Sequence, residues 1–89
     1  MYSLKISKQA AKFLKSGKIP EDDLILIDKK ILSLAVDPYQ PGVKKIKGKK
    51  GYIRARAGNY RIIYTVEGRR LIVFIIGLGD RKDIYRIFG

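Results

Sequence analysis

The sequence predicts an α+β fold, in which an N-terminal strand and a helical hairpin pack on an antiparallel β-sheet meander. Three observations predict it. The chain opens with a strand-like alternation, continues with two helical patterns, and then contains three apolar runs separated by short turns. A chain of 89 residues is long enough for one hydrophobic core and too short for two. We therefore expect residues 1–89 to form a single domain.

The first half of the chain contains the strand and the helical hairpin. Residues 2–7 alternate apolar with polar side chains, which is typical of a half-buried strand. Ser7 can cap a short first helix that stops near residues 16–17. A second helix is expected from Pro20 to residue 36, because Asp37-Pro38 ends it. The apolar stripe of this helix consists of Leu24, Ile27, Ile31, Leu34 and Ala35.

The second half predicts the meander. Strand-like runs occupy residues 52–57, 60–66 and 71–78, and the short turns between them indicate antiparallel hairpins. Residues 39–51 are rich in glycine and lysine, and we expect a mobile basic loop there. The last eleven residues predict a turn or short helix that docks on the sheet through Ile84, Ile87 and Phe88. The helices then cover one sheet face, and the other face is left uncovered.

Positive charge is concentrated in the second half of the chain. The net charge is +12; residues 44–89 contain thirteen Lys and Arg against three acids, and residues 1–43 contain seven against five. Such a field attracts a polyanion, of which RNA and DNA are the most common. Solubility alone, or an acidic protein partner, is the alternative explanation.

Three arginines flank the Gly58-Asn59 turn. If that turn is a two-residue hairpin loop, Arg56 opposes Arg61 and Arg54 opposes residue 63, so all three arginines share the uncovered face. Directly opposed like charges destabilise a sheet, which suggests that an anion such as phosphate normally lies there. The alternative is that Arg56 reaches Asp80 or Asp83. By the same parity, Tyr60 and Tyr64 belong to the core.

The composition excludes several kinds of catalysis. The chain has no histidine and no cysteine, so paired-imidazole ribonucleases, serine-type triads and thiolate zinc sites are ruled out. Only Glu67, Asp80 and Asp83 are acidic in the basic half, which disfavours a two-metal nuclease, and no phosphate-binding glycine loop is present. We expect no metal and no cofactor. Without a signal peptide or membrane span, we expect a soluble, cytoplasmic protein. The reaction that remains possible is one at a phosphate group, in which Arg, Lys and Tyr side chains stabilise charge.

Two motifs in the second half are more specific. The segment YIRARAGNYRIIYTV, followed by LIVFIIGLGDRKDIY, resembles the RelE/ParE toxin superfamily, with its Arg-x-Arg-x-Gly-x-Tyr-Arg hairpin and later Gly-x-Arg-x-x-x-Tyr. The resemblance implies a RelE-like fold and a toxin of a type II toxin–antitoxin system. It further implies a ribosome-dependent endoribonuclease that cuts mRNA in the A site by attack of the 2'-hydroxyl on the adjacent phosphate. The implied partners are the ribosome, mRNA and a RelB-like antitoxin.

The resemblance also assigns site residues. Arg61 and Arg81 would stabilise charge on the scissile phosphate, and Tyr85 would stack on or orient a nucleotide. Arg54 takes a position where the RelE pattern has a base-like lysine, and Tyr52 likewise replaces a lysine. The catalytic set is thus expected to be Arg54, Arg61, Arg81 and Tyr85. RNA binding is assigned to Lys45, Lys47, Lys49, Lys50, Arg56 and Lys82, and Lys47 or Lys49 is a candidate base.

Simpler interpretations of these residues stay open. Arg81 could form a salt bridge with Asp80 or Asp83, and Tyr85 could be a packed side chain. At the level of function, the alternatives are a ParE-type protein that poisons DNA gyrase and a non-catalytic RNA-binding module. Cleavage of mRNA on programmed ribosomes and inhibition of DNA supercoiling separate the three.

Overall fold

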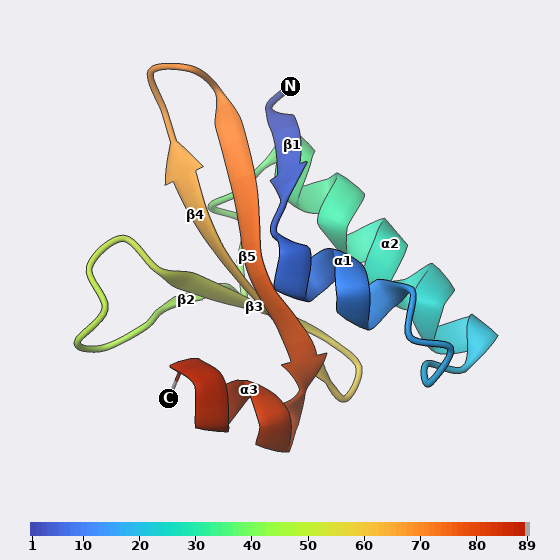
Figure 1. Ribbon diagram of the computed structural model, residues 1–89. Coiled ribbons are helices and arrows are strands. Elements are labelled where there is room, and N and C mark those ends of the chain that lie inside the picture. Colours follow the sequence, from blue (N-terminus) through green and yellow to red (C-terminus); the bar gives the residue numbers. More distant parts are fainter. Residues whose placement is uncertain (89) are drawn as a thin grey trace.

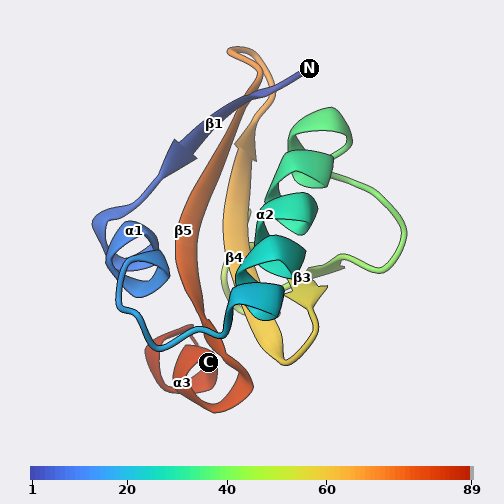
Figure 2. The same cartoon turned by 90° about the vertical axis from the view of Figure 1, so that its right-hand side faces the viewer.

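The computed structural model describes residues 1–88, and the side chains of residues 1–84. Five strands form one sheet in the order β1-β5-β4-β3-β2, and α1 and α2 lie together on one face of it (Figures 1 and 2). No helix in the described chain is long and apolar enough to cross a membrane. The predicted α+β class is confirmed. The elements are β1 (Ser3–Ile6), α1 (Lys8–Leu14), α2 (Glu21–Val36), β2 (Lys44–Lys45), β3 (Ile53–Ala57), β4 (Tyr60–Glu67), β5 (Ile72–Asp80) and α3 (Arg81–Phe88).

The N-terminal strand joins the sheet at its far edge. β1 pairs in parallel with β5, from Ser3 opposite Ile72 to Ile6 opposite Ile75. After β1 the chain stays attached to β5, because the side-chain amide of Gln9 donates to the Leu78 carbonyl and accepts from its N–H, both at 2.9 Å. The Gln9 side chain therefore extends the hydrogen bonding along β5 beyond the end of β1, where the main chain has already entered α1.

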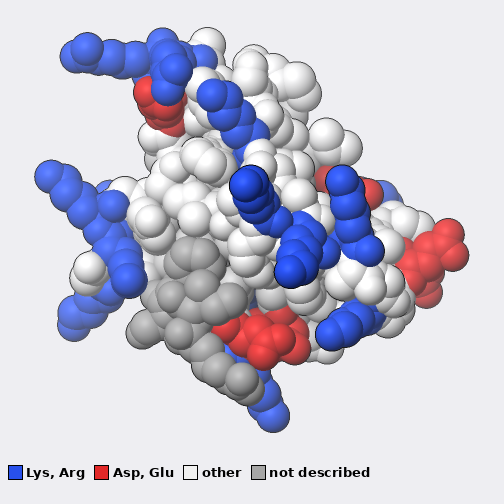
Figure 3. Space-filling view, in the orientation of Figure 1, with Lys and Arg blue, Asp and Glu red and all other residues white. Residues whose placement is uncertain are grey.

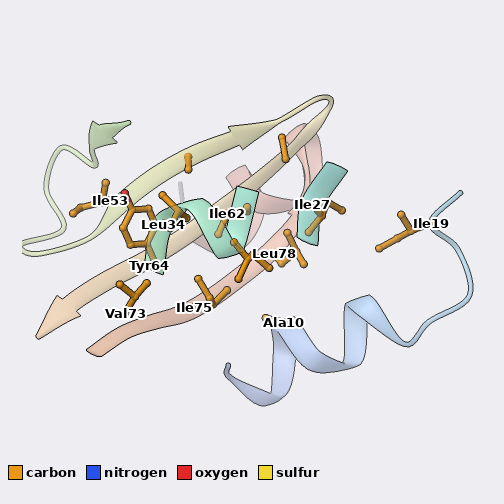
Figure 4. Close-up of a cluster of buried hydrophobic side chains, with 13 residues drawn as sticks. Ala10, Ile19, Ile27, Leu34, Ile53, Ile62, Tyr64, Val73, Ile75 and Leu78 are labelled. Atoms are coloured by element: carbon orange, nitrogen blue, oxygen red, sulfur yellow. The ribbon is translucent and has the colours of Figure 1, made fainter. Parts of the chain in front are cut away.

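Helix α2 buries its apolar stripe on the sheet. Pro20 is the N-cap and not the first helical residue, so the helix begins one residue later than expected. It ends at the predicted Asp37, whose N–H donates to the Ser33 carbonyl at 2.9 Å. The core formed below the two helices centres on Tyr64, which is fully buried among aliphatic side chains (Figure 4). Its hydroxyl donates to the Pro38 carbonyl at 2.5 Å and so fixes the exit from α2.

The β3–β4 hairpin has the predicted register. Ala57 pairs with Tyr60, Arg56 with Arg61, and residue 54 with residue 63. The turn requires glycine at position 58, where φ is +61°. The three strands of the meander differ from their predicted ranges by one or two residues at their ends.

A bulge in β5 sets which of its residues face the core. Tyr64 pairs with Ile75 and Ile63 with Gly77, so Ile76 is the extra residue. Beyond the bulge Leu78 returns to the core, and Gly79 lies opposite Arg61 on the other face. A side chain at Gly79 would meet Ile84 of α3 at 3.6 Å.

Helix α3 therefore covers part of the sheet face that we expected to be uncovered. Ile84 is 2% exposed, as predicted for a docked residue. Ile87 and Phe88, predicted to dock with it, lie outside the described side chains.

The expectation of an unstructured loop at residues 39–51 is wrong in part. Lys44 and Lys45 form β2, which pairs with β3 at Arg54 and Ile53 and is the edge strand of the sheet. Three main-chain hydrogen bonds then close the following turn: Ile46 N–H to the Tyr52 carbonyl at 2.9 Å, Tyr52 N–H to the Lys49 carbonyl at 3.1 Å, and Lys49 N–H to the Ile46 carbonyl at 3.3 Å. Two lysines carry no strand signal in the sequence, so the pairing of β2 with β3 was not predicted.

Candidate nucleic-acid interface

A pocket of about 280 Å³ opens beside the β3–β4 hairpin, on the sheet face opposite α1 and α2. No acidic residue is among the residues that line it. We call it the arginine pocket, and its lining residues are Gly42, Lys44, Arg54, Ala55, Arg56, Arg61 and Arg81. The structure thus brings together three of the four predicted catalytic residues, together with Arg56 from the predicted RNA-binding set.

The five cations of the pocket come from four elements, namely β2, β3, β4 and α3. Lys44 pairs with Arg54 across β2 and β3, and Arg56 faces Arg61 across β3 and β4. Arg81 begins α3 directly after β5, and its N–H donates to the Asn59 carbonyl at 3.1 Å. This bond ties the start of α3 to the hairpin turn, so the arginines sit on a connected framework.

Two of these arginines donate hydrogen bonds to main-chain carbonyl oxygens of the hairpin. Nε of Arg56 donates to the Gly58 carbonyl at 3.1 Å, and Arg61 donates to the Tyr60 carbonyl at 3.4 Å. A carboxylate oxygen of Asp80 accepts from the N–H of Asp83 at 2.9 Å and so caps α3. Within the described side chains, Arg56 does not form the salt bridge to Asp80 or Asp83 that was the alternative.

One ion pair lies in the β4–β5 turn, away from the arginine pocket. Arg70 contacts Glu67 at 2.7 Å. The hydrogen bond from Arg70 lowers the pKa of the Glu67 carboxyl, and the same bond raises the pKa of Arg70. Glu67 is therefore paired with Arg70 at this turn and does not line the arginine pocket.

The hairpin tip is anchored to the helices from the core side. The Tyr60 hydroxyl donates to a carboxylate oxygen of Asp23 at 3.2 Å, and its ring lies 6.1 Å from that of Phe13. Burial, and then the hydrogen bond to Asp23, raise the pKa of Tyr60. Tyr60 and Tyr64 are thus part of the core cluster or packed on it, as predicted.

A second pocket, of about 390 Å³, lies on the helix side of the sheet, beyond the C-terminal end of α2. We call it the lysine pocket, and it is lined by Tyr39, Lys45, Ile46, Lys49, Lys50, Gly51, Ile53 and Val66. Three of the predicted RNA-binding lysines therefore lie together, but separately from the arginines.

The remaining predicted residues lie in neither pocket. Lys47 and Lys82 are exposed and line neither one. Tyr85 lies outside the described side chains. Neither candidate base, Lys47 or Lys49, lines the arginine pocket. Lys44, which does line it, was not assigned by sequence reasoning, because the pairing of β2 with β3 is what turns it toward Arg54.

The distribution of charge follows the two pockets. Figure 3 shows Lys and Arg side chains projecting from the edge of the molecule formed by β2 and the turn after it. Acidic side chains in this view lie near the β4–β5 turn, near α3 and at the start of α2. The cationic edge therefore has no acidic neighbours in this view.

A five-stranded sheet with two helices on one face matches the fold of solved RelE toxins of the RelE/ParE superfamily. The chain matches the family model described as "ParE toxin of type II toxin-antitoxin system, parDE" over residues 4–85. It belongs to this family of type II toxins. The superfamily inferred from the two sequence motifs is thereby confirmed.

Solved toxin structures share the fold. The archaeal RelE–RelB complex from Pyrococcus horikoshii OT3 matches with 30% identity and a TM-score of 0.76, over 90% of this chain and 94% of that chain. The RelB–RelE complex from Methanococcus jannaschii matches with 29% identity and a TM-score of 0.72, over 96% and 99%. Isolated E. coli RelE, at 21% identity and a TM-score of 0.74 over 99% and 100%, shows likeness of fold alone. Comparison with curated protein sequences finds no match.

Proposed function

We propose that this toxin is a ribosome-dependent endoribonuclease that cuts mRNA in the A site and so inhibits translation. The observation that carries the proposal is the arginine pocket, where Lys44, Arg54, Arg56, Arg61 and Arg81 converge without an acidic lining residue. Guanidinium groups bind phosphate oxygens through paired hydrogen bonds and stay charged at any physiological pH. A site of this kind suits an RNA backbone better than a neutral substrate.

The reaction needs stabilisation of charge on the phosphate, which the pocket supplies, and an acceptor for one proton. The 2'-oxygen of one nucleotide forms a bond to the adjacent phosphorus, the bond from phosphorus to the 5'-oxygen breaks, and the products are a 2',3'-cyclic phosphate and a 5'-hydroxyl. The proton of the 2'-hydroxyl leaves to a base or to water, and the 5'-oxygen gains one. Arg61 and Arg81 stabilise the negative charge that develops on the phosphate oxygens. Arg54 binds the same phosphate, and Tyr85 orients the base.

The ribosome holds the mRNA so that the 2'-oxygen, the phosphorus and the 5'-oxygen lie in line. Arginine is a poor proton carrier, so the pocket alone offers charge stabilisation but little general base catalysis. Holding the mRNA in one conformation contributes to the rate through orientation. The proposal therefore places most of the activity in the complex with the ribosome.

A RelB-like antitoxin is the proposed inhibitor of this toxin. The relatives from P. horikoshii and M. jannaschii were solved as complexes of RelE with RelB. A polypeptide with acidic side chains would complement the cationic edge at β2 and compete with RNA for it. Cytoplasmic location follows from these partners and is part of the same proposal.

Inhibition of DNA gyrase is the second candidate, and the match to the ParE family model favours it. The two candidates differ in the use of the arginines, since a gyrase inhibitor has no scissile phosphate to stabilise. A non-catalytic RNA-binding module is the third, and it predicts binding without a cleavage product.

The test is a pair of assays on one protein preparation. Ribosomes programmed with a short mRNA are incubated with the toxin, and the new RNA ends are mapped; DNA supercoiling by gyrase is measured in parallel. We expect cuts in the A-site codon and unchanged supercoiling. The Arg61→Ala/Arg81→Ala variant should lose at least a hundredfold in cleavage rate, which is the loss known for a single preorganised donor to a transition state (about 10²–10³).

A matched control removes the same charge outside the pocket. Lys12→Ala/Lys18→Ala replaces two exposed lysines on the helix side of the molecule, and it should cleave as the wild type does. Full cleavage by the arginine variant, or inhibition of supercoiling without any cut RNA, would show that the proposal is wrong.

A further inference from the structure

We propose that the lysine pocket is a second subsite for the same single-stranded RNA, in which a base stacks on Tyr39 and its phosphate binds Lys45, Lys49 and Lys50. The inference rests on the proposed function in one respect, namely that RNA is the ligand of the arginine pocket. It adds a binding site on the opposite face of the sheet and a path for the strand around β2.

The lining of the lysine pocket combines two properties that a nucleotide needs. Its apolar part comes from the side chains of Ile46, Ile53 and Val66, and its charge comes from three lysines with no acidic lining residue. A volume of about 390 Å³ lies within the range of about 300–1,000 Å³ that is usual for small-ligand sites. An apolar wall beside a cationic rim fits a flat base attached to a phosphate.

Tyr39 is 60% exposed, although hydrogen bonds fix the residues on both sides of it. The carbonyl of Pro38 accepts the hydroxyl of Tyr64 at 2.5 Å, and the side-chain amide of Gln40 donates to the Asp37 carbonyl at 3.0 Å. The N–H of Tyr39 itself donates to the Asp37 carboxylate at 3.0 Å. An aromatic ring that is exposed on a fixed backbone is suited to stacking, because little conformational entropy is lost on binding.

The two pockets are connected around the edge of the sheet. Lys44 lines the arginine pocket and Lys45 lines the lysine pocket, since neighbouring residues of a strand point to opposite faces. Arg54 and Ile53 divide in the same way on the paired strand. Because β2 is the edge strand, an RNA strand can pass from one pocket to the other around β2 without crossing the sheet.

The cationic lining together with the exposed ring of Tyr39 favours RNA as the occupant of the lysine pocket. All the charged residues that line the two pockets are lysines and arginines, and a nucleic acid strand has one phosphate for every nucleotide along it. A single strand is required, because stacking on Tyr39 needs an unpaired base. Binding of an acidic protein segment in this pocket is the alternative that the experiment distinguishes.

The experiment measures stacking directly. Short RNAs carrying 2'-O-methyl groups, which remove the attacking hydroxyl, contain 2-aminopurine at one position in each of a series. The protein has no tryptophan, so the fluorescence of 2-aminopurine can be observed selectively. We expect one position to be quenched by the wild type and by Tyr39→Phe, but not by Tyr39→Leu, together with an affinity about tenfold weaker for Tyr39→Leu.

The lysines have a separate readout. Lys49→Ala/Lys50→Ala should reduce the slope of log affinity against log salt by about 0.7, because the two lysines bind one phosphate and each neutralised phosphate contributes about 0.7 for single strands. Lys12→Ala/Lys18→Ala, with the same change of charge on the helix side, should leave the slope unchanged. Thermal unfolding confirms that each variant is folded.

Three outcomes would overturn the inference. If Tyr39→Leu leaves both quenching and affinity unchanged while Arg61→Ala weakens binding, the lysine pocket does not bind RNA and the proposed function stands. If none of the variants changes RNA binding, the proposed function fails as well. If Tyr39→Leu binds RNA normally but weakens binding of the antitoxin, the occupant is a protein segment.

Discussion

Arg56 of β3 and Arg61 of β4 lie directly opposite each other, and each donates to a main-chain carbonyl oxygen, that of Gly58 and that of Tyr60. Two cations in one rung of a sheet repel each other, and sheets usually place opposite charges or apolar pairs there. The hairpin therefore keeps a destabilising arrangement that an RNA phosphate between the two side chains would relieve.

Replacing Arg56 by threonine should stabilise the free toxin. Removal of one of two opposed charges on a strand is expected to raise the free energy of unfolding by about 0.2–1 kcal/mol at low salt. The gain should shrink as salt screens the repulsion. Urea unfolding at two salt concentrations measures both effects. Arg69→Thr, at an exposed position of the β4–β5 turn, should change the free energy of unfolding by less than about 0.5 kcal/mol. A loss of stability in Arg56→Thr would contradict the repulsion.

Arg54→Lys should accelerate RNA cleavage. The RelE pattern has a base-like lysine at this position, and a lysine among Lys44, Arg61 and Arg81 would release its proton more readily than an isolated one. An arginine in its place cannot act as a base. We expect a gain of at least tenfold in the single-turnover rate on programmed ribosomes, within the range of about 10²–10⁴ for general base catalysis.

The control for that gain is Arg56→Lys, which makes the same exchange at a more exposed position of the same strand. It should not accelerate cleavage. An equal rate for wild type and Arg54→Lys would mean that residue 54 binds the phosphate without taking part in proton transfer.

Gly58→Ala should destabilise the hairpin that orients the arginines. The residue has φ of +61°, and an added Cβ would lie 3.0 Å from the Leu26 side chain. The left-handed conformation alone costs a non-glycine residue about 1–2 kcal/mol. Gly68→Ala, where nothing lies within 4 Å and φ is not positive, is the matched control and should change stability little. The melting temperatures of the two variants are compared by thermal unfolding. Equal values would show that an alanine at position 58 is not strained.

Alkaline pH should unfold the protein through Tyr64. Burial raises the pKa of Tyr64 above its ordinary value of about 10, and the pKa of Tyr60 is raised as well. Because the folded state holds the proton more tightly, this stability is fully present below pH of about 10 and is lost as the pH rises above it. Each such tyrosine adds about 1.4 kcal/mol per pH unit to the decline. Tyr64→Phe should show a shallower decline above pH of about 10, and an unchanged slope would show that Tyr64 is not responsible.

The hairpin register, the end of α2 and the buried face of α2 were predicted correctly from residues that are close together in the sequence. The Gly58-Asn59 turn fixed the register of the hairpin and hence the shared face of its arginines. Asp37-Pro38 ended α2 where expected, and the apolar stripe of that helix is the one that packs on the sheet. These features depend on residues a few positions apart.

Features that depend on distant pairing were not predictable. The sequence predicts a strand at residues 2–7 but not its parallel partner β5, which is nearly seventy residues away. The bulge at Ile76 and the two-residue β2 leave no periodic signal. The lysine pocket was missed for the same reason, because Tyr39 and Val66 meet only when the sheet is assembled.

The parallel pairing of Ser3 with Ile72 has a consequence for biosynthesis. The N-terminal strand leaves the ribosome nearly seventy residues before its partner, so this edge of the sheet cannot form until β5 has been made. Completion of the sheet is therefore a late event in synthesis, and the pairing of two strands so far apart in the chain is expected to slow folding.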